Sequence, residues 1–209
     1  EFGHGLHALF SDGKYSRTCG NVPRDFVELP SQVMENWAGD PEVLRMYAKH
    51  WQTGEVIPEE IINKLVNSGL FNQGFETTEF LAAAILDMEY HKLKEIGDDF
   101  NAAEFEKAKM KEIGLIDEIY PRYRSTYYAH IFSGGYSAGY YVYYWAAVLD
   151  SDAFNYFKES GDLFNPELAA KFRQHCLQEC GNDEGMVQYK KFRGQEPSNE
   201  PFLKKHGLN

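Results

Sequence analysis

Apolar residues recur at the spacing of a buried helix face along most of the chain, and a glycine follows many of these runs. Pro58 and Gly69 bracket one such run, and a proline at the first helical position with a glycine after the last is typical of helix ends. No convincing run alternates apolar and polar residues, as strands of a large sheet require. We therefore predict an all-α fold.

The same pattern of apolar runs with initiating and terminating residues predicts the other helices. We expect them over residues 79–96, 101–113, 137–160, 166–180 and 183–192, with a further helix starting at Pro23. The tail from Gly194 to Asn209 contains two prolines and is expected to pack as an irregular arm. The chain has no internal repeat and no low-complexity linker, so we expect residues 1–209 to form one domain or the greater part of one.

Composition excludes several classes of partner. Twenty-one Lys and Arg face thirty-two Asp and Glu, which gives a net charge of −11. Nucleic acid and anionic membrane surfaces would repel such a chain, and we find no local basic patch. No apolar stretch reaches the roughly 18 residues that a membrane span needs. The cysteines are Cys19, Cys176 and Cys180, an odd number that favours a reducing, cytoplasmic compartment.

Glu1 and His4 lie three residues apart, which places both on one face of a helix. They match the second half of the H-E-x-x-H pattern, in which two histidines bind zinc and the glutamate acts on the attacking water. The first histidine would precede Glu1, so we expect the chain to have been cut from something longer. E-x-x-H alone is a weak signal, and a solvated first turn is the alternative.

The segment after Pro23 carries acidic residues that could complete a metal site with the E-x-x-H pattern of Glu1 and His4. If the helix begins at Pro23, Asp25, Glu28 and Glu35 lie on neighbouring turns of one face. One of these carboxylates would supply a further zinc ligand, and Asp25 or Glu35 would orient the ligands.

Tyrosines are concentrated between Ser125 and Trp145, around the glycine-rich stretch Ser133 to Tyr136. Gly134 and Gly135 allow the backbone to approach a ligand closely. Peptide hydrolysis needs donors aimed at the oxyanion, and the side chains that fit are those of His130, Tyr136, Tyr140 and Tyr143. The three tyrosines share a helix face if that helix begins near Ser137. The alternative is that this aromatic stripe belongs to the core.

Three long strings occur in a fixed order, E-F-G-H-G-L-H-A-L-F, V-P-R-D-F-V-E-L-P-S-Q and H-I-F-S-G-G-Y-S-A-G-Y-Y. They resemble the thimet oligopeptidase family of zinc metallopeptidases, and the resemblance covers the whole chain. The stretches Arg122–Phe132 and Tyr189–Pro197 are most similar to the branch that releases dipeptides. The resemblance implies a C-terminal, multi-helical part of a catalytic domain, from a parent about three times longer whose active site lies in a deep channel between helical lobes.

The resemblance also implies roles for the residues of the first two strings. It makes His4 and Glu28 zinc ligands and Glu1 the general base. The first histidine ligand has no counterpart, so we expect this chain to bind zinc weakly and to be almost inactive alone. His7 would orient ligands in the metal's surroundings, although a helix histidine satisfied by a neighbouring carbonyl or carboxylate is the interpretation we favour.

In the third string and just after it, the resemblance assigns His130, Tyr136 and Tyr143 to transition-state stabilisation and substrate binding. Tyr140, Gly134 and Gly135 join them in binding the substrate. We interpret the remaining tyrosines as packing residues, namely Tyr127, Tyr128, Tyr141 and Tyr144. Arg122 and Arg124 are expected to form ion pairs, and Cys176 and Cys180 to be buried thiols without a function.

The resulting hypothesis is a zinc metallopeptidase that releases C-terminal dipeptides from short peptides. We expect its partners to be these peptides and the missing N-terminal part of the parent chain. One alternative keeps the chemistry and cleaves internal bonds, as oligopeptidases do. A second alternative is a non-catalytic helical binding module that has lost the metal site. Apolar surface left uncovered by the missing lobe would also favour self-association.

Overall fold

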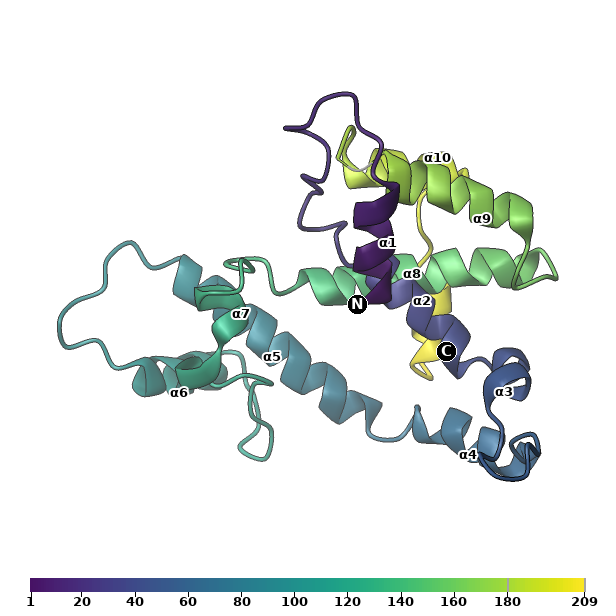
Figure 1. Cartoon of the computed structure of the whole chain (residues 1–209). Helices are drawn as coiled ribbons and strands as arrows, with labels where there is room; N and C mark the ends of the chain where they lie inside the picture. Colours follow the sequence, from purple (N-terminus) through teal and green to yellow (C-terminus); the bar gives the residue numbers. More distant parts are fainter. Residues whose placement is uncertain (180, 209) are drawn as a thin grey trace. The chain divides into compact units, whose positions relative to one another are not determined.

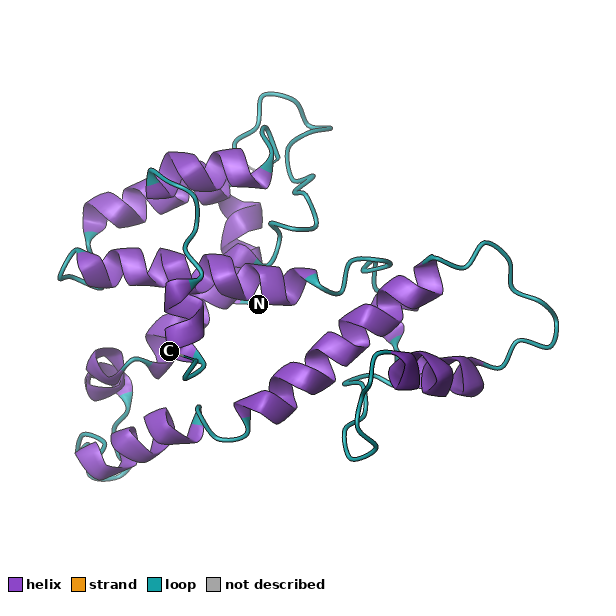
Figure 2. Ribbon diagram, turned by 180° about the vertical axis from the view of Figure 1, so that it is seen from behind, coloured by secondary structure: helices purple, strands orange, loops and turns teal. Residues whose placement is uncertain are grey.

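We describe a computed structural model of the chain, which covers residues 1–179 and 181–208. Over these residues the chain forms helices joined by loops, with an isolated β-bridge between Lys49 and Val56 (Figure 2). The prediction of an all-α fold is confirmed. The chain divides into two compact units, and unit 2 is Asn72–Tyr143, while unit 1 comprises Glu1–Phe71 and the chain from Tyr144 onward.

Unit 1 contains most of the helices of the described residues, and Figure 1 labels them all except η2 and α11. They are α1 (Phe2–Phe10), α2 (Leu29–Gly39), α3 (Pro41–Tyr47), α4 (Glu59–Ser68), nearly all of α8 (Val142–Glu159), α9 (Pro166–Phe172), the π-helical η2 (Arg173–Gln178), α10 (Gly185–Arg193) and α11 (Glu200–Lys205). Its core joins buried residues of α2, α8, α9, η2 and α10, with Leu29, Leu149 and Phe192 among them. Helix α1 packs against α2 and η2, which fixes the first turn of the chain on this core.

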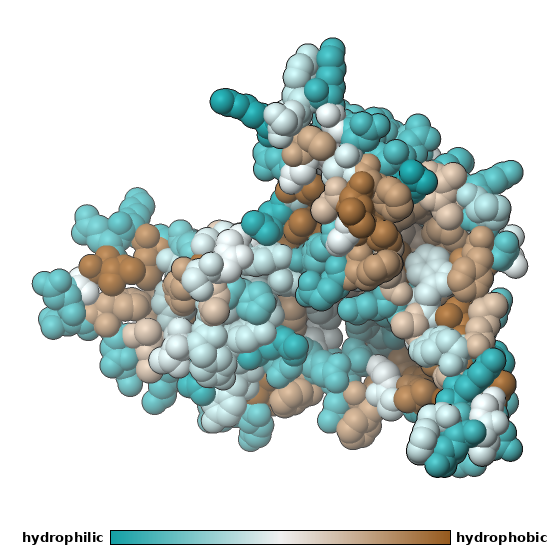
Figure 3. Space-filling view, viewed as in Figure 1, coloured by the Kyte–Doolittle hydropathy of each residue, from teal (hydrophilic) through white to brown (hydrophobic). Residues whose placement is uncertain are grey.

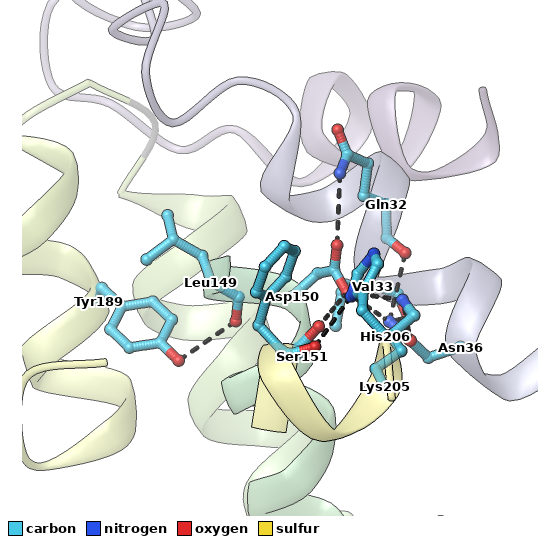
Figure 4. Close-up of polar contacts among 10 residues, drawn as sticks. Gln32, Val33, Asn36, Leu149, Asp150, Ser151, Tyr189, Lys205 and His206 are labelled. Atoms are coloured by element: carbon cyan, nitrogen blue, oxygen red, sulfur yellow. Dashed lines mark hydrogen bonds and ion pairs between the residues drawn. The ribbon is translucent and has the colours of Figure 1, made fainter. Parts of the chain in front are cut away.

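A buried carboxylate ties three helices of unit 1 together (Figure 4). Asp150 of α8 is 2% exposed and accepts hydrogen bonds from Asn36 Nδ2 at 2.8 Å and Gln32 Nε2 at 3.3 Å, both from α2. Lys205 of α11 lies 3.4 Å from the same carboxylate and donates to Asn36 Oδ1 at 2.8 Å. A buried charge is tolerated only when it is paired and hydrogen-bonded, so this junction fixes α2 against α8.

Unit 2 contains α5 (Gln73–His91), α6 (Ala102–Glu112), the 3₁₀ helix η1 (Ser125–Tyr127) and the short α7 (Ala129–Phe132). Its core is built from alanines of α5 with Leu86, Met110, Tyr128 and Ile131. The buried Glu106 of α6 accepts hydrogen bonds from both the N–H and the Oγ of Ser125, each at 2.7 Å. This carboxylate therefore anchors the segment that leads into α7.

Several predicted helix ends are confirmed. Helix α4 follows Pro58 and is capped by Gly69. The Asn101 side chain accepts hydrogen bonds from the backbone of Ala103 and Glu104 at the start of α6.

The helix predicted from Pro23 is wrong, because α2 begins only at Leu29. Residues 24–28 form turns, with Phe26 N and Val27 N donating to the Pro23 carbonyl. A continuous helix would force the ring of Pro30 against the carbonyl of residue 26, four positions earlier. The proline that starts the helix is therefore Pro30.

The helices predicted over 79–96 and 137–160 are displaced. Helix α5 runs from Gln73 to His91, so both of its ends precede the predicted ones. Thr78 lies inside this helix, where its hydroxyl donates to the Gly74 carbonyl and does not cap the start. Helix α8 begins at Val142, since Ala138 adopts a positive φ of 52° that no α-helix accommodates.

The remaining differences lie near the end of the chain. The helix predicted over 166–180 changes to π-helix at Arg173, and Cys180 lies outside the described residues. The tail predicted to be irregular contains α11, in which Pro201 occupies the first turn and Phe202 is 8% exposed. A proline in the first helical turn removes no helical hydrogen bond, because the N–H groups of that turn have no partner within the helix. Pro201 therefore allows a helix to begin in the tail that was predicted to be irregular.

Apolar side chains also remain on the surface of both units (Figure 3). Along α5 these include Leu81, Ile85 and Met88, which are 40%, 38% and 39% exposed and lie on one helix face. None of the helices in the described part of the chain has the length and hydrophobicity to span a bilayer.

Candidate functional site

In unit 1, the first turn of α1 meets the residue that precedes α2. His4 Nε2 lies 3.2 Å from Glu28 Oε2. Glu28 is 4% exposed, whereas the His4 side chain is 35% exposed. The structure thus brings together the two residues that the sequence resemblance assigns to zinc, one buried and one reachable from solvent.

Ser31 orients the Glu28 carboxylate. Its Oγ lies 2.8 Å from Glu28 Oε2 and 2.8 Å from the carbonyl of the same residue. Ser31 is itself buried, and a hydrogen-bonded carboxylate keeps its position as a metal ligand. The sequence analysis did not identify Ser31. A serine three residues after a carboxylate at the start of a helix is the pattern that could have revealed it.

A glycine allows α1 and α2 to approach closely enough for this contact. A Cβ atom on Gly3 would lie 2.1 Å from the Pro30 carbonyl oxygen, so no side chain fits there. On the other face of α1, a Cβ on Gly5 would meet nothing within 4 Å. Gly3 therefore governs the distance between the helix that carries His4 and the residue that precedes α2.

Glu1 and His7 flank His4 on α1. Glu1 is exposed, occupies the N-cap position, and lies three residues before His4 as the half-motif requires. His7 is 5% exposed, and its Nε2 has no hydrogen-bond partner among the described residues. The interpretation of His7 as a satisfied helix histidine is therefore wrong for this nitrogen. Burial, aided by the nearby His4, lowers the pKa of His7.

The other two acidic residues of the predicted face lie apart from this pair. Asp25 is exposed in the turn before α2, and Glu35 is exposed on α2. Because α2 starts at Leu29, Asp25 and Glu28 do not share a helix face. Their proposed role in orienting zinc ligands stays a prediction.

The His4–Glu28 geometry fits a shared zinc ion. Zinc binds imidazole nitrogen and carboxylate oxygen at roughly 2.0–2.2 Å with tetrahedral angles, which places two ligand atoms roughly 3.3 Å apart. The observed separation of 3.2 Å agrees with this value. Within the described ranges, no third His, Cys, Asp or Glu joins the two in a metal-binding group. The described residues thus bring together two candidate ligands, one fewer than the three protein ligands of a catalytic zinc site.

In unit 2, one histidine and three tyrosines form a ring cluster around α7 and the start of α8. His130 lies 5.5 Å from Tyr140 and 6.1 Å from Tyr143 between ring centroids. Tyr136 and Tyr143 are stacked at 5.1 Å. His130 and the three tyrosines predicted with it are therefore adjacent. The prediction that the tyrosines share a helix face is wrong, because α8 begins only at Val142 and includes Tyr143 alone.

The glycine-rich stretch folds back on α7. Gly135 has a φ of 80°, and a Cβ on Gly134 would lie 2.9 Å from the His130 Cα. The Tyr136 N–H then donates to the His130 carbonyl at 2.9 Å. Tight contact with α7 thus requires glycine at position 134.

The cluster members differ in accessibility. Tyr140 is 3% exposed, and burial raises its pKa above the ordinary value. His130, Tyr136 and Tyr143 are partly exposed. The three accessible side chains can present hydrogen-bond donors to a ligand, whereas Tyr140 packs beneath them.

The secondary predictions have mixed outcomes. Arg122 pairs with Glu79 at 3.3 Å and Arg124 pairs with Glu106, as expected.

The four tyrosines interpreted as packing residues divide into two groups. Tyr128 is 1% exposed and Tyr144 is partly buried, so the packing interpretation holds for these two. It is wrong for Tyr127 and Tyr141, which are 59% and 47% exposed. Cys176 is a buried thiol whose pKa is raised by burial.

Comparison with known proteins identifies the class. The family model described as Peptidase family M3 matches residues 1–208. The chain is 45% identical to the dipeptidyl carboxypeptidase of Escherichia coli, 37% identical to oligopeptidase A of the same organism and 35% identical to saccharolysin of Saccharomyces cerevisiae. Each alignment includes the whole chain.

The chain belongs to peptidase family M3. It spans 31% of the length of the dipeptidyl carboxypeptidase and of oligopeptidase A, and 29% of saccharolysin.

Proposed function

We propose that this chain is the zinc-binding and tyrosine-bearing part of a longer metallopeptidase that releases dipeptides from the C-termini of short peptides. The single observation that carries the proposal is the 3.2 Å contact between His4 Nε2 and Glu28 Oε2. Membership of peptidase family M3 and the 45% identity to a dipeptidyl carboxypeptidase support the reaction. Since the chain spans 31% of that relative, the full activity belongs to a longer protein.

His4 and Glu28 would hold the zinc ion, with Ser31 fixing the carboxylate. A zinc ion there supplies polarisation of the scissile carbonyl and activation of the attacking water. Glu1, on the same helix face as His4, would accept the proton of that water and deliver it to the leaving amine.

His130, Tyr136 and Tyr143 would donate hydrogen bonds to the oxyanion and to the peptide backbone. Their partial exposure and mutual contacts support this role, because preorganised donors stabilise a transition state without a reorganisation cost. Tyr140, Gly134 and Gly135 would shape the surface on which the peptide lies.

With two ligands present, we propose that the chain as it stands binds zinc weakly and is almost inactive, and that a histidine placed before Glu1 completes the ligand set. Residues 1–209 would then be part of one catalytic domain. Short peptides and the rest of the parent chain are the proposed partners, and the cytoplasm is the proposed location.

Zinc content tests the metal site. Elemental analysis after dialysis would compare this chain with one extended so that a histidine precedes Glu1, and we expect about one zinc per chain only in the extended form. In that form Glu28→Gln should weaken zinc binding on the order of 1,000-fold, and Ser31→Ala on the order of 10- to 100-fold. Glu42→Gln is the matched control, because Glu42 is exposed on α3 and has no proposed role at the metal site, and it should change nothing. Equal zinc binding by the extended chain and its Glu28→Gln variant would refute the assignment.

The products distinguish the three functional hypotheses. With an N-terminally blocked peptide and the complete peptidase, successive loss of C-terminal dipeptides supports the proposal, whereas internal cleavage supports the oligopeptidase alternative. If the protein binds the peptide but neither hydrolyses it nor binds zinc, the result supports the hypothesis of a non-catalytic binding module.

A further inference from the structure

A fully buried carboxylate on α5 faces the loop that carries Tyr136 and Tyr140. Asp87 is 0% exposed. Its Oδ1 accepts a hydrogen bond from the Ala138 N–H at 2.9 Å, and its Oδ2 accepts one from the Tyr140 N–H at 2.9 Å. Both oxygens of one carboxylate thus bind the backbone of a single short loop.

The loop needs such a clamp. Ala138 has a φ of 52°, a left-handed conformation that alanine adopts only at an energetic cost. Strained backbone persists where its surroundings over-determine it, and such positions gather at ligand clamps. The two hydrogen bonds to Asp87 flank Gly139. They hold the strained Ala138 on one side and Tyr140, two residues before α8, on the other.

Asp87 has one further polar neighbour. His91 follows one turn later on α5, and its Nδ1 lies 2.8 Å from Asp87 Oδ1. Hydrogen bonds to a charged acceptor are stronger than those to a neutral one. The carboxylate is therefore a firm anchor point within the core of unit 2.

The opposite edge of the loop is held by α7. Ser137 Oγ donates to the Ile131 carbonyl at 2.6 Å, and the Tyr136 N–H donates to the His130 carbonyl at 2.9 Å. Between these two attachments and Asp87, the backbone of residues 136–140 has little freedom. The ring of Tyr136 is thereby kept against Tyr143.

We propose that Asp87 is a positioning residue of the peptidase, which acts through the loop backbone to hold Tyr136 and Tyr140 where the substrate needs them. The inference rests on the proposed function of these tyrosines. It adds a residue outside the strings that revealed the family.

Amide hydrogen exchange in the whole chain tests the clamp. We expect Asp87→Asn, which replaces one acceptor oxygen by a donor, to speed exchange at Ala138 and Tyr140 by about 10- to 100-fold while α5 stays protected. Asp152→Asn is the matched control, because Asp152 of α8 is also 0% exposed but bonds Tyr189 and Arg193 in unit 1. It should leave both loop amides unchanged.

Unchanged exchange at Ala138 and Tyr140 in Asp87→Asn would overturn the clamp. If Asp87→Asn unfolds unit 2, a measurement on the unsubstituted chain tests the clamp instead. A scalar coupling across the hydrogen bond, from the Ala138 or Tyr140 amide nitrogen to the Asp87 carboxyl carbon, supports the clamp, and unprotected amides without such a coupling overturn it.

Peptide binding separates this inference from the function on which it rests. Binding of an N-blocked tetrapeptide, followed by the ring resonances of Tyr136, should weaken about 10-fold in Asp87→Asn if the positioned loop contacts substrate. A loosened loop with unchanged peptide affinity makes Asp87 a purely structural residue and overturns positioning. A peptide that does not bind even the unsubstituted chain counts against the proposed role of the tyrosines, and the exchange rates then decide the clamp alone.

Discussion

The two units hold their functional residues in different ways. In unit 1 the candidate metal ligands are a pair, one on α1 and the other directly before α2, and within the described residues no third candidate ligand joins them. In unit 2 the histidine and tyrosines form a connected ring cluster, and the loop between them is fixed by hydrogen bonds from α5 and α7. A metal site depends on a few atoms at set distances, whereas a cluster of aromatic donors is maintained by the packing of its own unit.

The largest expected effect concerns the helix contact that sets the distance between the metal ligands. Gly3→Ala should cost about 2–3 kcal/mol of stability, because its methyl group would overlap the Pro30 carbonyl, and His4 should move away from Glu28. Gly5→Ala is the matched control on the open face of α1 and should stabilise by about 0.5–1 kcal/mol. Urea denaturation measures both; equal midpoints would contradict the packing argument.

An intermediate effect is expected in unit 2, where packing maintains the cluster. Tyr128 is 1% exposed, and its hydroxyl donates to the Ala83 carbonyl at 3.1 Å. Tyr128→Phe leaves that buried carbonyl without this donor and should lower stability by about 1 kcal/mol. The adjacent Tyr127 is 59% exposed, and Tyr127→Phe should stay within about 0.5 kcal/mol of the parent. Thermal denaturation of the two variants tests whether depth of burial separates them.

The smallest effect is a pH dependence in unit 1. Burial lowers the pKa of His7 in the folded chain, so the unfolded chain takes up this proton first as the pH falls. The stability that His7 contributes is present above its unfolded pKa, about 6.5, and is lost below it. His7→Met should reduce the drop in urea midpoint between pH 7.5 and pH 5.5, whereas the same change at the exposed His50 should not. An identical drop in His7→Met would show that other groups cause the acid sensitivity.

The helical class was predictable because helix periodicity is a local property. The motifs also named residues that the structure places together, His4 with Glu28 and His130 with its three tyrosines. The sequence analysis missed features that depend on contacts between distant segments. Pro30 defines the start of α2 only when the clash with residue 26 is considered. The positive φ of Ala138 occurs where its N–H bonds Asp87, fifty-one residues away. Ser31 and Asp87 were missed for the same reason, since each acts on a neighbour that the local pattern does not reveal.

The short helix α11 has a practical consequence for anyone who shortens this chain. A boundary drawn after Gly194, as the proline-rich tail invites, would remove Phe202, which packs against Tyr144 at 5.4 Å. It would also remove Lys205, the cation beside the buried Asp150. Truncation would thus leave a carboxylate of the unit 1 interior without its positive neighbour. The tail is a structural component of unit 1, and expression boundaries should retain it.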